Sequence, residues 1–238
     1  GQLVLLHGRN AAKLAAAKQA VGGNNQTYQA DLSSLQETKV LAQAIKADHA
    51  SLDVVINNAG IFKTPVTKTA DGLDIRFVVN TLAPYQLARD LMAIMPAAGR
   101  IVNLSSAAQA PVNLAAMASG AALEDFDAYA QSKLAITQWT FAMANELSGG
   151  PLMVSVNPGS LLATKMVREG FGMAGKDVNI GRDILIRAAL SDEFEGRSGQ
   201  YFDNDAGDFG PPHPDAQNLA KSQELTKAVE ALIAKLLG

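Results

Sequence analysis

Tyr129 and Lys133 are the residues whose types and spacing most directly suggest chemistry. They stand four positions apart, which on a helix places both side chains on one face, one turn from each other. A tyrosine has a pKa of about 10, and a nearby ammonium group favours the phenolate and lowers that pKa. The pair therefore predicts a proton donor or acceptor that works near neutral pH. The alternative interpretation is a surface tyrosine beside a solvated lysine.

Polar residues also follow several short apolar runs that read as strands. They are Arg9, Asp31, Asn58, Ser106 and Asn157. Ligands of parallel α/β sheets bind beyond the carboxyl ends of the strands. These positions therefore predict a binding site along one edge of a sheet.

Strand-like and helix-like segments alternate along the chain. Strands are predicted at residues 2–7, 26–30, 53–56, 100–104, 152–156 and 200–202. Helices are predicted at residues 10–21, 34–49, 71–95 with a bend at Pro84, 126–147, 181–190 and 215–236. Residues 107–124 are expected to form a loop with one short helix, and residues 160–180 an irregular, mobile flap. This alternation predicts an α/β fold in which helices cover both faces of a doubly wound parallel sheet, with residues 1–238 forming a single domain.

The composition restricts the class of protein. The chain has 238 residues, 48% of them hydrophobic, and a net charge of −3. It lacks cysteine, which excludes disulfides and thiolate chemistry. Its three histidines form no metal-ligand pattern, and no apolar run approaches the length of a membrane span. We therefore expect a cytoplasmic protein without a metal, a nucleic-acid partner or a membrane span.

The motifs together resemble the short-chain dehydrogenase/reductase family over nearly the whole chain. The resemblance rests on five features in order, which are Asn57-Asn58-Ala59-Gly60, Asn80, Ser105-Ser106, Tyr129-x-x-x-Lys133 and Pro158-Gly159. The separation of Ser106 from Tyr129 is about ten residues longer than in most members. That length, with the tail at residues 200–205, resembles the retinol-dehydrogenase-like branch. The resemblance implies a Rossmann-like fold.

The resemblance also implies roles for the catalytic residues. Tyr129 would donate a proton to the substrate oxygen, and Lys133 would lower the pKa of Tyr129 and bind the nicotinamide ribose. Ser106 would hydrogen-bond the carbonyl oxygen, with Ser105 as its competitor for that role. Asn80 would hold a water molecule bound to Lys133. The alternative for Asn80 is a residue that only interrupts the regularity of a helix.

Further residues are implied to contact a dinucleotide cofactor. Asn58, Ala59 and Gly60 would let the backbone approach the adenosine ribose, or would form an ordinary turn. Asp31, with Leu32 beside it, would contact the adenine, or would cap a helix. The remaining candidates lie near the nicotinamide and its carboxamide, and they are Pro158, Gly159 and Thr164, the last one residue further along than usual.

The choice of cofactor depends on the end of the first predicted strand. NAD enzymes place a carboxylate there to bind the ribose 2′-hydroxyl. Here the strand ends in Gly8, and Arg9 offers a planar fork suited to a phosphate. The sequence therefore predicts NADP, with NAD as the alternative if Arg9 is only an exposed charge.

One departure from the family concerns the start of the chain. The family begins with a strand and a Gly-rich turn that holds the cofactor pyrophosphate. This chain opens instead at what resembles the second strand. An N-terminally incomplete chain is therefore expected, with strands at residues 3–6 and 53–56 left without their shared neighbour.

Three functions are compatible with these motifs. The first is an NADP-dependent oxidoreductase of a carbonyl or alcohol, with an apolar substrate. The second is a sugar-nucleotide epimerase or dehydratase of the related extended class, and the third is a non-catalytic nucleotide-binding fragment. The Ala- and Leu-rich helices at 71–95 and 126–147 further predict a homo-oligomer that pairs through them.

Overall fold

The strands form two parallel sheets. The structure is a computed structural model that describes residues 2–147 and 149–238, apart from the side chains of residues 165, 169 and 171. One sheet pairs β1 (Val4–Gly8) with β2 (Asn25–Gln29). The other has the order β3 (Val54–Asn57), β4 (Arg100–Leu104), β5 (Leu152–Asn157), β6 (Gln200–Asp203) and β7 (Asp208–Gly210). Only β7, an edge strand that the sequence did not predict, runs antiparallel.

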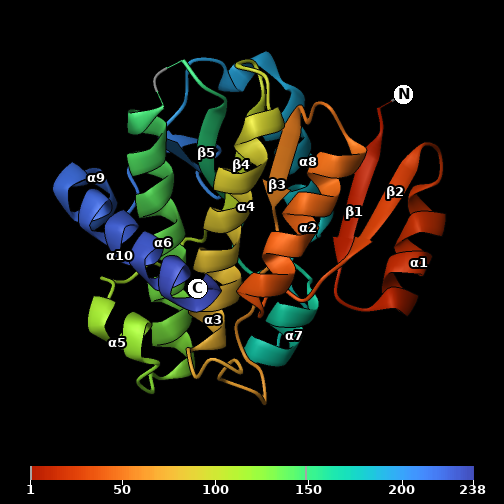
Figure 1. Ribbon diagram of the computed structural model, residues 1–238. Helices are drawn as coiled ribbons and strands as arrows, with labels where there is room; N and C mark the ends of the chain where they lie inside the picture. The colour runs from red at the N-terminus through yellow and green to blue at the C-terminus, as the bar shows by residue number, and fades with distance from the viewer. Residues whose placement is uncertain (1, 148) are drawn as a thin grey trace.

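Helices cover both faces of the larger sheet, which confirms the predicted α/β class (Figure 1). On one face lie α2 (Leu35–Asp48), α4 (Ala83–Leu91), α6 (Asp125–Glu146) and α10 (Leu219–Leu237), around the main core. On the other lie α8 (Asn179–Leu190) and the 3₁₀ turn η3 (Asp192–Phe194), around a smaller core. In the described part of the chain, no helix is both long and apolar enough to cross a bilayer.

Side-chain caps fix where the first two helices begin. Asn10 caps α1 (Ala11–Val21) by accepting from the Lys13 amide, as predicted. Ser34 caps α2 by accepting from the Glu37 amide. The Glu37 carboxylate in turn accepts from the Asp31 amide at 2.8 Å. The interpretation of Asp31 as a helix cap is therefore wrong, since Ser34 has that role.

The helix predicted at residues 71–95 is shorter and less regular. Asp74 caps its first segment, α3 (Ile75–Phe77). A π-helical turn, η1 (Val78–Leu82), follows before α4, and a 3₁₀ turn, η2 (Met92–Ile94), ends the run. Pro84 lies in the first turn of α4, where a missing amide hydrogen is tolerated. The irregularity therefore lies at η1, and such turns occur often at functional sites.

The flap has more structure than expected, and the predicted C-terminal helix has less. The flap at residues 160–180 contains a helix, α7 (Lys165–Phe171), and an isolated bridge between Leu162 and Lys176. The loop at 107–124 contains one short helix, α5 (Leu114–Ser119), as predicted. The predicted C-terminal helix is interrupted at Asn218, which separates α9 (Pro214–Gln217) from α10.

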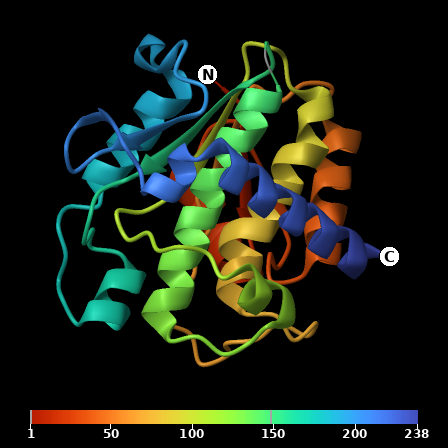
Figure 2. The same cartoon turned by 90° about the vertical axis from the view of Figure 1, so that its left-hand side faces the viewer.

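Helix α10 lies across α6 and toward α4 and α2 (Figure 2). Leu225 and Val229 of α10 share the main core with Trp139 of α6. The Tyr85 hydroxyl of α4 donates a hydrogen bond to Glu230 of α10. The apolar faces expected to pair α4 and α6 with a second copy are thus covered within one chain. Self-association stays a prediction, without the surface on which it was based.

The edges of β1 and β3 that do not face their paired neighbours carry exposed apolar residues. β1 pairs only with β2, and β3 only with β4, among the described strands. Leu3, Val4 and Ile56 are 40%, 40% and 41% exposed. An unpaired strand edge presents backbone donors and acceptors that another strand can use. The described strands therefore form two sheets with no pairing between β1 and β3.

Candidate functional site

The carboxyl ends of β3 and β4 meet α6 along its middle. Asn57, Asn103 and Thr140 form a buried chain of hydrogen bonds, with the Asn57 amide donating to Asn103 at 2.8 Å and the Asn103 amide donating to Thr140 at 2.9 Å. Hydrogen bonds between buried side chains fix the elements that carry them. These residues therefore hold the ends of β3 and β4 at a defined height against α6.

Lys133 lies inside this junction, 4% exposed. Its Nζ donates a hydrogen bond to the Leu104 carbonyl oxygen, at the end of β4, over 2.7 Å. Burial lowers the pKa of Lys133 to about 8, because a low-dielectric environment disfavours the charged form. At neutral pH the ammonium form still predominates, so the site contains a buried positive charge.

Removing this ammonium group is expected to change how stability depends on pH. Between about 8 in the folded protein and the ordinary 10.5, the unfolded chain holds the proton that the folded chain has lost. The free energy of unfolding therefore rises with pH across this window, by about 3 kcal/mol relative to Lys133→Met. Urea unfolding at both ends of the window measures this, with the exposed Lys18→Met as control. The same pH dependence in wild type and Lys133→Met would contradict the assignment.

The pKa of Tyr129 shifts in the direction opposite to the one expected from the sequence. Its ring lies 5.8 Å from Lys133 Nζ, measured to the ring centroid. Burial raises the pKa of Tyr129, and a hydrogen bond with the Ser106 side chain acts against this rise without cancelling it. The expected lowering of this pKa by Lys133 is therefore wrong for the described geometry. Tyr129 is protonated at neutral pH, as a proton donor must be.

The two serines have different surroundings. Ser105 is buried, and its hydroxyl donates to the Lys133 carbonyl at 3.1 Å and shares a 2.7 Å hydrogen bond with Thr137. Ser106 is only partly buried; its hydroxyl accepts from the Ala108 amide at 3.1 Å and is near enough to Tyr129 to lower the pKa of that phenol. This geometry favours Ser106 over Ser105 as the residue that reaches a substrate.

Asn80 lies in the π-helical turn η1 and is fully buried. Its side chain accepts from the Ile61 amide at 2.8 Å and donates to the Ile61 carbonyl and to Ser132, both at 2.9 Å. All hydrogens of the side-chain amide are thus used, which argues against its holding a water molecule. A water held by the main-chain groups at Asn80 stays a prediction.

Gly60 lies beside both Lys133 and Asn80. A Cβ at Gly60 would lie 3.5 Å from Lys133 Nζ and 3.6 Å from Asn80 Oδ1. Asn58 and Ala59, just before it, are exposed at the end of β3. The three predicted cofactor residues therefore run from the surface down to the catalytic candidates.

The candidates for the adenosine end lie beside β1 and β2. Arg9 is exposed directly after β1, and its carbonyl accepts from the Gln29 side chain at 3.3 Å. Asp31 accepts from the Ser33 amide at 2.9 Å, so its carboxylate stabilises the turn before α2. Leu32 is buried in the main core. Arg9 and Asp31 thus follow the strands of the smaller sheet, whereas Leu32 belongs to the main core.

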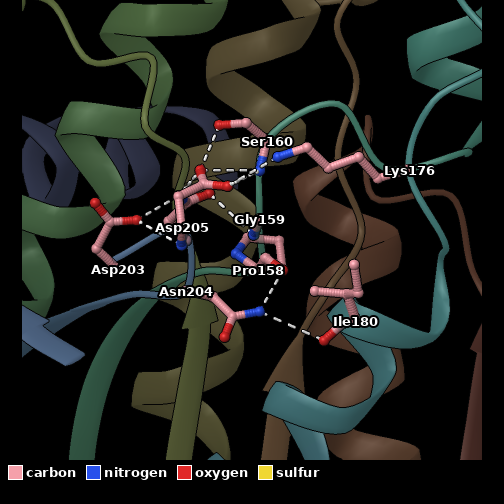
Figure 3. A network of polar contacts seen from close by, with 9 residues as sticks. Pro158, Gly159, Ser160, Lys176, Ile180, Asp203, Asn204 and Asp205 are labelled. Atoms are coloured by element: carbon pink, nitrogen blue, oxygen red, sulfur yellow. Dashed lines mark hydrogen bonds and ion pairs between the residues drawn. The ribbon is translucent and has the colours of Figure 1, made fainter. Parts of the chain in front are cut away.

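The turn after β5 is held by the tail after β6 (Figure 3). Asn204 donates to the Pro158 carbonyl at 3.0 Å and to the Ile180 carbonyl at 3.4 Å. Gly159 has a φ of 119°, which a residue with a side chain rarely adopts. The tail at residues 200–205, seen in the sequence only as a family feature, thus shapes the predicted nicotinamide pocket.

Asp205 is the centre of this network (Figure 3). Its carboxylate accepts from the Ser160 amide at 3.0 Å, from the Ser160 hydroxyl and from Asn157 at 3.0 Å, and pairs with Lys176 at 3.7 Å. Burial acts to raise the pKa of Asp205, but the hydrogen bonds from Ser160 and Asn157 and the Lys176 charge outweigh it and lower the pKa. Asp205 therefore joins the start of the flap to its end.

Thr164 caps α7 inside the flap, where its hydroxyl accepts from the Val167 amide at 3.3 Å. This gives Thr164 a local structural role beside the predicted contact with a carboxamide. Across the flap, a Cβ at Gly170 would come within 2.6 Å of the Phe62 ring. The flap therefore packs directly on Phe62.

An aromatic cluster beside Tyr129 was missed from the sequence. The rings of Phe62 and Tyr129 lie 5.2 Å apart, and those of Phe62 and Phe126 lie 6.3 Å apart. Phe126 is 50% exposed and stands three residues before Tyr129 on α6. That spacing was the available signal, since such residues share a helix face.

The chain is similar to known dehydrogenases. The family model described as "short chain dehydrogenase" matches residues 1–173. Retinol dehydrogenase 14 of Mus musculus is 31% identical over 72% of this chain and 57% of its own length. The polyprenol dehydrogenase of Homo sapiens is 30% identical over 74% of this chain and 59% of its own length. The chain therefore spans less than two thirds of these relatives.

A solved structure with the same fold carries a cofactor. The landomycin C-6 ketoreductase LanV, described with bound NADP and rabelomycin, is 26% identical, with a TM-score of 0.62 over 86% of this chain and 84% of its own. The matched range, residues 1–173, contains the β3 end, Asn80, Ser106 and the Tyr129/Lys133 pair. The chain belongs to the short-chain dehydrogenase family.

Proposed function

We propose that the protein is an NADP-dependent oxidoreductase that transfers a hydride between nicotinamide and a carbonyl or alcohol substrate. One observation carries this function: Lys133 is buried at the end of β4, bonded to the Leu104 carbonyl, with the Tyr129 ring 5.8 Å from its Nζ and Ser106 close enough to act on the phenol. A phenol, a hydroxyl and an ammonium group at one strand end suit proton transfer to a substrate oxygen.

In the direction of reduction, Tyr129 gives its proton to the substrate oxygen. Its raised pKa keeps the phenol protonated until the oxygen becomes basic. Ser106 donates a hydrogen bond to the same oxygen, and Lys133, buried behind Tyr129, is proposed to bind the nicotinamide ribose. The nicotinamide, when bound, supplies the hydride.

The described residues fit this cofactor at its two ends. At one end, Gly60 lets the backbone pass within contact distance of Lys133 and Asn80, and Gly159 opens the turn after β5. At the other end, the exposed Arg9 offers a guanidinium fork for a 2′-phosphate. The NADP described with the ketoreductase LanV supports the same choice.

Replacing Arg9 by aspartate is expected to shift cofactor preference from NADP toward NAD. The change removes a phosphate partner and adds a charge that repels phosphate. Hydrogen bonds to charged groups contribute about 1.5–3 kcal/mol, so the ratio of kcat/KM for the two cofactors should change by about 10- to 100-fold. The exposed Lys18→Asp makes the same change of charge at the far end of α1. A ratio that Arg9→Asp leaves unchanged would contradict the assignment.

The substrate is proposed to be apolar near its reacting carbon. Phe62 and the half-exposed Phe126 flank Tyr129, and the flap packs on Phe62. Apolar walls with few polar groups are typical of sites for apolar small molecules. The names of the two dehydrogenase relatives, retinol and polyprenol, both denote apolar alcohols.

Absorbance at 340 nm tests this function in the protein as its gene encodes it. NADPH with a panel of apolar aldehydes and ketones, and NADP with the matching alcohols, should give substrate-dependent changes. A polar sugar nucleotide serves as the comparison, since an epimerase or dehydratase would convert it without net change in NADPH. Absence of net hydride transfer with every carbonyl and alcohol would contradict the function.

A further inference from the structure

Three charged side chains join the helix that carries Asn80 to the helix that carries Tyr129. Arg76 of α3 is 1% exposed and Asp74 is 4% exposed. Arg76 Nε donates to Asp74 Oδ1 at 2.8 Å and Nη2 to Asp74 Oδ2 at 2.6 Å. Arg76 Nη1 donates to Asp125 Oδ1 of α6 at 2.5 Å. We propose that Arg76, acting through Asp125, is a positioning residue that holds the first turn of α6 so that Tyr129 lies against Ser106.

The rigid end of this contact is the pair of Asp74 and Arg76. Asp74 also accepts from the Arg76 backbone amide at 2.9 Å, which caps α3. Two guanidinium nitrogens of Arg76, Nε and Nη2, are thus bonded to Asp74, and Nη1 is left for the contact with α6. A planar fork with paired carboxylate contacts has a fixed direction. Arg76 therefore presents Nη1 to α6 from a defined place.

Asp125 connects Arg76 to the face of α6 that carries Tyr129. Asp125, Tyr129 and Lys133 follow one another at intervals of four residues on α6, so their side chains share one face. The position before the helix, Glu124, makes no capping bond through its side chain. The start of a helix frays unless it is fixed, and the bond from Arg76 fixes it one turn before Tyr129.

A second contact fixes α6 after Tyr129. The Asn80 amide donates to the Ser132 hydroxyl at 2.9 Å, and Thr81 donates to the Ser132 carbonyl at 3.0 Å. Tyr129 thus lies between two attachments of α6 to the segment that runs from α3 to η1. Without the first, the turn that carries Tyr129 would be held only from its C-terminal side.

This role rests on the proposed function, because it concerns the placement of the proton donor. Asp125→Ala is the informative variant. It removes the contact to α6 but leaves the buried pair of Arg76 and Asp74 intact, whereas loss of Arg76 would leave a buried carboxylate unpaired. Asp127→Ala is the matched control, because Asp127 is an exposed acid in the same helical turn. Both changes remove a negative charge near the helix N-terminus.

In the gene-encoded protein, Asp125→Ala is expected to lower kcat by about 10- to 100-fold, the scale for a displaced reacting group. The KM for NADPH should change little, and Asp127→Ala should keep wild-type kcat. Asp125→Asn, which keeps an oxygen for Arg76, should recover part of kcat. A kcat for Asp125→Ala equal to that of Asp127→Ala would overturn the positioning role.

A second measurement does not depend on turnover. With tyrosine labelled at ¹³Cζ, the signal of Tyr129 is assigned by its absence in Tyr129→Phe. Loss of the Ser106 contact should move that signal in Asp125→Ala but not in Asp127→Ala, since Ser106 perturbs the phenol. An unmoved Tyr129 signal would overturn the inference even if the enzyme is active. A wild-type protein that transfers no hydride, with a signal that moves, would instead contradict the proposed function alone.

Discussion

Tyr129→Phe is expected to lower kcat of the gene-encoded protein by about 10²- to 10⁴-fold, the scale of general acid–base catalysis. The ring, its 5.2 Å contact with Phe62 and the packing of α6 remain. Only the proton donor is lost, so NADPH binding should be close to that of wild type. Steady-state kinetics together with an NADPH titration separate the two effects.

Tyr28→Phe is the matched control for this change. Tyr28 lies on β2, and its hydroxyl contacts Asp48 and His49 at 2.9 Å, remote from β4 and α6. Loss of that hydroxyl should leave kcat unchanged. Near-normal turnover by Tyr129→Phe would remove Tyr129 from the mechanism, whatever the other residues contribute.

The second prediction with a large expected effect concerns the absence of strand pairing between β1 and β3 among the described strands. We propose that a parallel strand fits between β1 and β3, where it would pair both open edges and cover Leu3, Val4 and Ile56. A Gly-rich turn after such a strand would direct backbone amides at the cofactor pyrophosphate. Residues 1–238 preceded by a strand and Gly-rich turn from a short-chain dehydrogenase should bind NADPH saturably, whereas residues 1–238 alone should not. Isothermal calorimetry on both proteins measures this.

A third protein separates the strand from the turn. In it the strand is kept and the turn glycines are replaced by valine, whose side chains would block the approach of the pyrophosphate. This protein should gain thermal stability over residues 1–238, as the strand covers apolar surface, but should not gain NADPH binding. Saturable binding of NADPH by residues 1–238 alone, as tight as with the graft, would show that another segment binds the pyrophosphate.

Local sequence patterns were sufficient for the elements that carry the site. The apolar runs before Asn57 and Ser105 became β3 and β4, and Asn10 and Ser34 capped their helices as predicted. Such signals act over a few residues, so they can be read without knowing the fold. The alignment of Tyr129 with Lys133 on α6 follows from helical spacing alone.

The contacts that place those residues are long-range and were not predictable. Arg76 meets Asp125 across 49 positions, and no local pattern marks that pair. The direction in which the pKa of Tyr129 shifts depends on burial, which only the packed structure shows. The π-helical turn at Asn80 was likewise not predicted, because Pro84 is the local signal for an irregularity in this helix and the π-helical turn precedes it.

The most direct test of the catalytic assignment follows the hydride and the proton donor together. NADPH carrying deuterium at the transferred position of C4 is mixed with an apolar carbonyl substrate, and the alcohol product is analysed by mass spectrometry. With the wild-type protein, one deuterium should appear on the carbinol carbon; with Tyr129→Phe, its rate of appearance should fall by about 10²-fold or more. An alcohol without deuterium, or equal rates for the two proteins, would contradict the assignment of Tyr129, Ser106 and Lys133 as the centre of hydride transfer.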